Sequence, residues 1–140
     1  EERERNSQMQ DLSQLYEIAR QTLRPMELTQ YGEAGQVACA LETAAGNIFT
    51  GICIDLPCSL GFCAEQAAMA EMLKSGETQI VQILAVGEEG NVLPPCGRCR
   101  EFMAQVDRRN LDALAAVSRF QAVPLKELLP KRWDEESFEK

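Results

Sequence analysis

The chain has 140 residues, of which 45% are hydrophobic and 26% charged, and its formal net charge is −8. This length and balance predict one domain with a real core. The acidic charge disfavours a nucleic-acid partner and an anionic membrane surface, and no apolar run approaches the roughly 20 residues that span a bilayer.

The N-terminal stretch is polar and has no apolar core followed by a small-residue cleavage site, so we expect no secretory signal. Six cysteines could form disulfides, but a chain of this size folds without them. We therefore expect a cytoplasmic protein with reduced thiols. The sequence contains no histidine, which excludes Ser-His-Asp triads and every mechanism that needs imidazole.

The first part of the chain reads as a tail followed by a helix. Residues 1–10 are polar and predict a flexible tail, and residues 11–140 a single domain. Apolar residues then recur at helical spacing, which predicts one amphipathic helix ended by Pro25; they are Leu12, Leu15, Ala19 and Leu23.

The middle of the chain alternates strands and helices. Apolar runs at 37–41 and 48–54 flank turn residues at 45–47, which predicts a β-hairpin. Residues 62–74 are good helix formers. The β-branched run 80–86 is typical of a strand that is buried on both faces.

The last third is less clear. Apolar residues spaced three and four apart predict a helix over 99–106, whereas 111–117 fits either a helix or a strand. A short strand at 120–123 precedes Pro124, which could open a helical turn through 126–129. Strands that alternate with helices indicate an α/β fold around one buried sheet.

Two short motifs carry the chemistry: Cys63-Ala64-Glu65 and Pro95-Cys96-Gly97-Arg98-Cys99. Each opens a predicted helix, where free backbone N–H groups stabilise thiolates. Three thiolates hold Zn²⁺ and leave its fourth tetrahedral position open, which is typical of catalytic zinc sites. We therefore predict Cys63, Cys96 and Cys99 as zinc ligands.

Glu65 follows Cys63 at a spacing that turns through about 200° in a regular helix. The two side chains can meet only if Cys63 is the non-helical cap residue and Glu65 lies in the first turn. Glu65 is then a proton carrier and not a ligand. Three thiolates leave the centre negative, and Arg98 and Arg100 could balance that charge or simply be solvated.

Together the motifs resemble the zinc signature of the cytidine deaminase superfamily in its all-cysteine form. The similarity runs from about Gln36 to Arg100, and the tail with Trp133 resembles blasticidin-S deaminase. The resemblance implies a three-layer α/β/α fold with a mixed sheet of about five strands, one zinc per subunit and a homotetramer. It also implies hydrolytic loss of the 4-amino group of a cytosine nucleoside, or of a cytosine-containing antibiotic, in pyrimidine salvage or detoxification.

The resemblance also assigns substrate contacts. The places where the family holds the ribose are occupied here by Gly35, Cys53 and Asp55, and Asp55 can still accept a hydrogen bond from a ribose hydroxyl. The backbone N–H of Ala64 corresponds to the family's contact with the base. Trp133 is either a surface residue or an aromatic lid over the ligand.

Three other interpretations stay open at this stage. The Cys96–Cys99 pair also resembles a thioredoxin-type redox motif, although that leaves Glu65 unexplained. A non-catalytic zinc module would need a fourth ligand, for which Cys58 is the candidate. A polynucleotide-editing deaminase is disfavoured by the acidic charge.

Overall fold

The computed structural model describes residues 2–135, and for residues 2–11 it gives the course of the helix only. Strands alternate with helices along the chain, which confirms the α/β class. The elements are α1 (Glu2–Thr22), β1 (Met26–Glu27), β2 (Glu33–Thr43), β3 (Ile48–Asp55), α2 (Ala64–Lys74), β4 (Ile80–Gly87), β5 (Val92–Leu93), α3 (Gly97–Val106), the 3₁₀ helix η1 (Arg108–Asp112), β6 (Leu114–Ser118), β7 (Gln121–Pro124) and the 3₁₀ helix η2 (Leu125–Leu128).

The sheet contains seven strands, where the sequence predicts about five. Five longer strands lie in the order β3–β2–β4–β6–β7, with β4 and β6 parallel and the other neighbours antiparallel. The two additional strands, β1 and β5, are two residues long and pair with β2 and β4. Strands this short leave no alternating pattern in a sequence, which is why they escape prediction.

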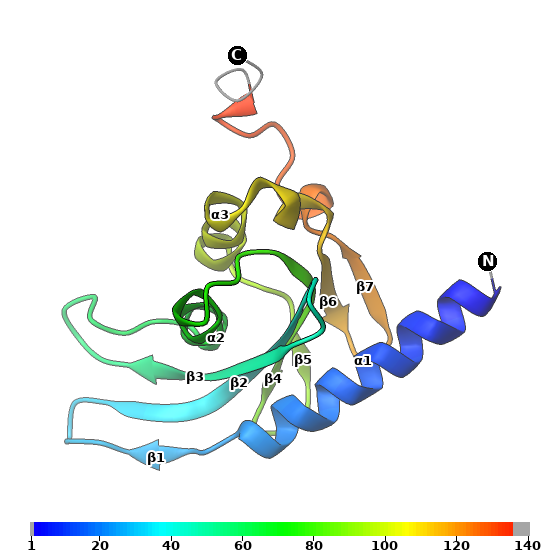
Figure 1. Ribbon diagram of the computed structural model, residues 1–140. Coiled ribbons are helices and arrows are strands. Elements are labelled where there is room, and N and C mark those ends of the chain that lie inside the picture. The colour runs from blue at the N-terminus through cyan, green and yellow to red at the C-terminus, as the bar shows by residue number, and fades with distance from the viewer. Residues whose placement is uncertain (1, 136–140) are drawn as a thin grey trace.

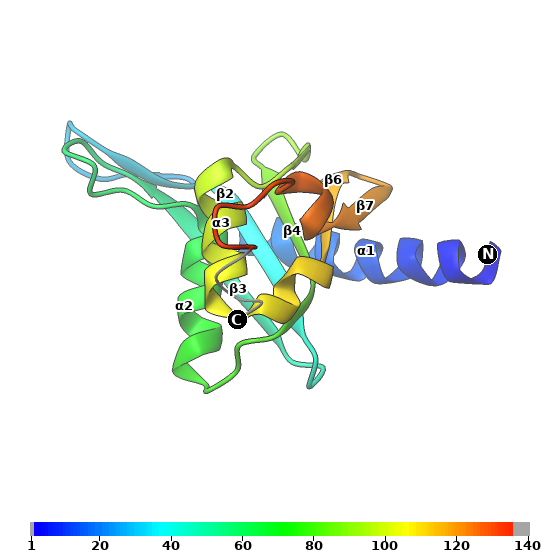
Figure 2. The same cartoon turned by 90° about the horizontal axis from the view of Figure 1, so that it is seen from above.

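Helices cover both faces of the sheet, as Figures 1 and 2 show. On one face α1 buries Leu12, Leu15, Tyr16 and Ala19 against Ala40, Leu84 and Val86 of the central strands. On the other face the methionines of α2 and α3 form the larger core with residues of β2 and β4; among them are Met69, Met72, Met103, Leu41 and Ile83. This arrangement confirms the three-layer α/β/α fold.

A glycine on β3 allows α2 to lie directly on the sheet. A Cβ at Gly51 would stand 2.4 Å from the Ala68 nitrogen and 2.6 Å from the Ala64 oxygen, so a larger residue would push the helix away. The predicted β-hairpin is present, because β2 and β3 pair antiparallel with Cys39 opposite Gly51. The close approach fixes the start of α2 over the sheet.

One segment differs from the sequence-based expectation, and the structure of a second decides between two predicted alternatives. α1 begins at Glu2, so residues 2–10 continue a helix where a flexible tail was expected; their Glu, Arg, Gln and Met residues are good helix formers. The ambiguous stretch 111–117 becomes the end of η1 and most of β6.

Within residues 2–135 no helix is long and apolar enough to span a bilayer.

Candidate metal centre and active site

Both motifs open helices, and both first cysteines are the cap residues. Cys63 precedes α2 with φ −79° and ψ 157°, and Cys96 precedes α3 with φ −68° and ψ 167°. Both residues thus lie outside the helices that they precede, whereas Cys99 lies in the first turn of α3. The non-helical position that the Cys63–Glu65 spacing requires is therefore present.

The three sulfur atoms converge on one point. Sγ of Cys96 lies 3.6 Å from Sγ of Cys63 and 3.5 Å from Sγ of Cys99, and all three lie within 4.8 Å of one another. Tetrahedral zinc with Zn–S bonds of about 2.3 Å places its sulfurs about 3.8 Å apart. The group is thus positioned to bind one zinc ion through three ligands, which leaves the fourth position for a small molecule.

A fourth cysteine does not join this group. Among the described residues, the set that could hold a metal contains Cys63, Cys96 and Cys99 alone. Cys58 is exposed, and its backbone has a φ of 63°, in the left-handed region. The four-cysteine zinc module therefore has no support in the geometry.

Without a cation, the surroundings of the three thiols disfavour the thiolate form of Cys63 and Cys99. Burial, followed by the hydrogen bond with Cys96, raises the pKa of Cys63 to about 11. Burial and the charge of Glu65 raise the pKa of Cys99 well above its ordinary value. Burial also disfavours the Cys96 thiolate, but hydrogen bonds from the start of α3 outweigh it and lower the pKa of Cys96. A divalent cation bound to the sulfurs would stabilise the thiolates and so lower the pKa values of Cys63 and Cys99.

Glu65 is a buried carboxylate beside the sulfur group, with 6% of its surface exposed. Burial raises its pKa above the usual range, although its own backbone N–H and the Cys99 thiol partly oppose this. A carboxyl group whose protonated form is stabilised by its surroundings is suited to take up a proton and return it.

A cavity of about 460 Å³ opens over the cysteines and the carboxylate. This is within the usual size range for small-molecule sites. Several predicted site residues from three segments line it: Cys53, Asp55, Cys63, Ala64, Glu65, Cys96 and Arg98.

On β3, Cys53 is buried while Asp55, the last residue of the strand, is exposed. The Cys53 thiol accepts the Val37 N–H at 3.4 Å and lies 3.5 Å from Oε1 of Gln36, to which it can donate. Asp55 is exposed and lines the same cavity. Both residues therefore line the same cavity as Glu65.

The two predicted charge-balancing arginines differ. Arg98 is exposed and lines the cavity. Arg100 instead donates hydrogen bonds to two backbone carbonyls, those of Pro95 and Leu128. These bonds of Arg100 connect two chain segments and do not lead to the sulfurs.

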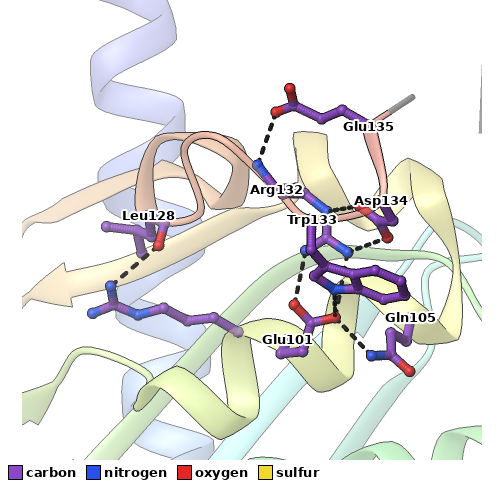
Figure 3. A network of polar contacts seen from close by, with 8 residues as sticks. Glu101, Gln105, Leu128, Arg132, Trp133, Asp134 and Glu135 are labelled. Carbon is purple, nitrogen blue, oxygen red and sulfur yellow. Dashed lines mark hydrogen bonds and ion pairs between the residues drawn. The ribbon is translucent and has the colours of Figure 1, made fainter. Parts of the chain in front are cut away.

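Trp133 does not line the cavity of its own chain. Its ring is 73% exposed, and its Nε1 donates to Glu101 on α3 at 3.3 Å (Figure 3). The neighbouring Arg132 anchors this segment through ion pairs with Glu101 and Asp134. These bonds hold Trp133 on α3 of its own chain, and its role as an aromatic lid stays a prediction.

Gln66 is a site residue whose contact the sequence analysis does not predict. It is 7% exposed, and its Nε2 donates to Sγ of Cys99 at 3.7 Å. A neutral donor of this kind stabilises the thiolate form of a ligand. A polar residue placed on the buried face of a helix beside a metal motif is the signal that could have identified it.

A family model for the cytidine and deoxycytidylate deaminase zinc-binding region matches residues 9–113. The chain belongs to this family of zinc-binding deaminases. The match includes both cysteine motifs and Glu65.

Individual relatives agree with this assignment. A cytidine deaminase from Halalkalibacterium halodurans is 33% identical over 72 residues, which are 51% of this chain and 54% of that protein. The match thus spans about half the length of this curated relative. The crystal structure of the cytidine deaminase from Bacillus anthracis is similar with a TM-score of 0.70 and 27% identity, covering 91% of this chain and 93% of that one. The cytidine deaminase from Mycobacterium tuberculosis has the same fold, with a TM-score of 0.73 and 24% identity over 88% and 97% of the two chains.

Proposed function

We propose that this protein is a zinc-dependent hydrolytic deaminase. Its substrate is a cytosine nucleoside or a cytosine-containing nucleoside antibiotic, whose 4-amino group is replaced by a carbonyl with release of ammonia. One observation carries the proposal: the buried Glu65 carboxylate adjoins three converging thiols at a pocket of nucleoside size.

The proton transfers are assigned to Glu65 alone. A zinc ion held by the three cysteines would supply a water molecule that loses a proton near neutral pH. Glu65 accepts this proton as the water oxygen bonds to C4, and it passes the proton to N3. It then takes the proton of the new C4 hydroxyl and delivers it to the departing amine, so that the C4 carbonyl forms, the C4–N4 bond breaks and ammonia leaves. The absence of histidine is therefore no obstacle.

The remaining pocket residues would orient the substrate. Ala64 is the first residue of α2, where backbone N–H groups have no partner within the helix, and it lines the cavity. We assign its N–H to the carbonyl of the base. Asp55 is assigned to a sugar hydroxyl, with Cys53 beside it and Arg98 at the pocket wall.

A thiol–disulfide redox role fits the arrangement less well. Such a protein needs two thiols that close a bond, whereas here a third thiol and a buried carboxylate share the same point.

We further propose a homotetramer with its sites near subunit interfaces. Large apolar side chains are exposed on β1, the turn between β1 and β2 and the loop after β3, which project from the body of the domain (Figure 2). Tyr31 and Leu60 are each 68% exposed, and Phe62 of the same region lines the cavity. Exposed apolar surface of this kind is typical of protein interfaces. The free thiols fit a reducing compartment such as the cytoplasm.

A substrate panel tests the proposed function. Zinc-loaded protein is offered cytidine, deoxycytidine and blasticidin S in parallel, and ammonia release is measured with the Glu65→Ala variant as the blank. We expect turnover of at least one substrate. Turnover of cytidine would indicate that Asp55 holds a ribose, and turnover of blasticidin S alone would indicate detoxification. Release by the variant at the rate of the native protein would contradict the mechanism.

A further inference from the structure

Arg100 joins two segments that flank the metal site. Its Nε donates to the Pro95 carbonyl at 2.7 Å, and its NH1 donates to the Leu128 carbonyl at 3.3 Å. Its backbone N–H also donates to the Cys96 carbonyl at 3.0 Å. The side chain and the main chain of one residue therefore hold both carbonyls of the Pro95–Cys96 turn.

This turn has few other means of support. Pro94 and Pro95 precede Cys96, and neither has an N–H with which to form a main-chain hydrogen bond. The β5 strand before them is two residues long, and Cys96 itself lies outside α3 in an extended conformation. Cys96 is exposed, whereas Cys99 is buried within α3. Of the two ligands on this motif, Cys96 is thus the one whose position depends on the turn.

The other end of the bridge is firmly anchored. Leu128 ends η2, whose Leu125 is fully buried and donates its N–H to Ala113 at 2.8 Å. Beyond η2, Arg132 is fixed by ion pairs of 2.6 Å to Asp134 and 3.2 Å to Glu101 (Figure 3). Contacts of the chain before and after Leu128 therefore fix this segment, and the hydrogen bonds of Arg100 connect it to Pro95.

We propose that Arg100 is a positioning residue that holds the Cys96 ligand in place by bridging the Pro95 turn to the C-terminal segment. The guanidinium is needed because its Nε and NH1 donate in two fixed directions. A lysine presents one ammonium group at the end of its stem, which cannot reproduce both bonds. The inference rests on the proposed zinc site but not on the identity of the substrate.

The test compares zinc affinity, measured by chelator competition, among the full-length native protein, Arg100→Met, Arg100→Lys and Arg109→Met. Arg109 is an exposed arginine that pairs with Asp107 beyond the far end of α3, so it controls for the loss of an arginine near this helix. We expect the dissociation constant of Arg100→Met to rise at least tenfold, as for other residues that orient metal ligands. Arg100→Lys should fall between it and the native protein, and Arg109→Met should stay within about twofold of native.

Activity supplies a second readout. With limiting zinc, Arg100→Met should lose kcat while KM is unchanged, and excess zinc should restore kcat. Equal zinc affinity in the native protein, Arg100→Met and Arg100→Lys would overturn the inference, as would an equal loss in Arg109→Met. If Arg100→Met does not fold, Arg100→Lys decides by the same criterion. A native protein that binds zinc without deaminating any substrate would contradict the proposed function and leave this inference standing.

Discussion

Replacing Glu65 by glutamine removes the proposed proton carrier and keeps the size of the side chain. The two side chains have nearly the same volume, so the substitution opens no cavity around a residue that is 6% exposed. Glutamine can still occupy the site beside Cys99, but it cannot accept and return a proton at neutral pH. The three thiols are not altered, so zinc should still bind.

The expected loss of kcat follows from the number of transfers that Glu65 performs. Positioned acid–base groups contribute about 10²–10⁴-fold to each step they catalyse. In the proposed mechanism Glu65 serves the attack on C4 and the departure of the amine, and the chain has no histidine that could substitute for it. We therefore expect kcat to fall by about 10⁴-fold or more, which is roughly 5 kcal/mol of transition-state stabilisation.

The assay follows the loss of cytosine absorbance under saturating zinc, with zinc content measured on the same sample. A variant that retains one zinc and loses less than about tenfold in kcat would refute the assignment. The metal-free protein offers an independent check. Because burial raises the Glu65 pKa, ionisation of Glu65 weakens folding as pH rises from the ordinary Glu range through the raised pKa. Metal-free Glu65→Gln should therefore be at least as stable as native protein at pH 7, and this advantage should vanish in acid.

Three further outcomes are expected. Because burial keeps the metal-free Cys63 and Cys99 thiols protonated at pH 7, zinc binding should release about two to three protons and weaken as pH falls. Calorimetry in buffers of different ionisation enthalpy measures the number of protons released. Zinc binding without proton release would contradict the assignment of thiolate ligands. Gln66→Leu, which removes the 3.7 Å bond to Cys99, should weaken zinc binding about tenfold in chelator competition, and an unchanged affinity would show that the bond is dispensable. Leu60→Glu should shift the light-scattering mass towards smaller species, whereas an unchanged mass would remove this surface from the interface.

The site was largely predictable because its geometry is local to two motifs. The Cys63–Glu65 spacing is incompatible with a regular helix unless Cys63 is the cap, and the observed ψ of 157° is that of a cap residue. The Cys96–Cys99 spacing likewise presents two sulfurs from the start of one helix. That the two motifs meet follows from the family resemblance and not from spacing, since Cys96 lies 33 positions after Cys63.

Features that depend on tertiary contacts were not predictable. The ambiguous region around 111–117 is settled by Asn110, whose side chain accepts from the Ile80 N–H at 2.7 Å and donates to the Met103 carbonyl at 2.9 Å. These partners lie on β4 and α3, and nothing in the local sequence indicates them. For the same reason Arg100 resembles a charge-balancing group in the sequence, although its bonds lead to carbonyls from two other segments. Trp133 is similarly placed by its bond to Glu101.

The most direct test of the account is whether deamination depends on the metal held by the three cysteines. Protein is stripped of metal, reloaded with one equivalent of zinc, and assayed before and after reloading for stoichiometric formation of ammonia and the deaminated product from the substrate that the panel identifies. The account predicts no turnover by the stripped protein and recovery of activity at one zinc per chain. Turnover of the substrate by fully metal-free protein would contradict it.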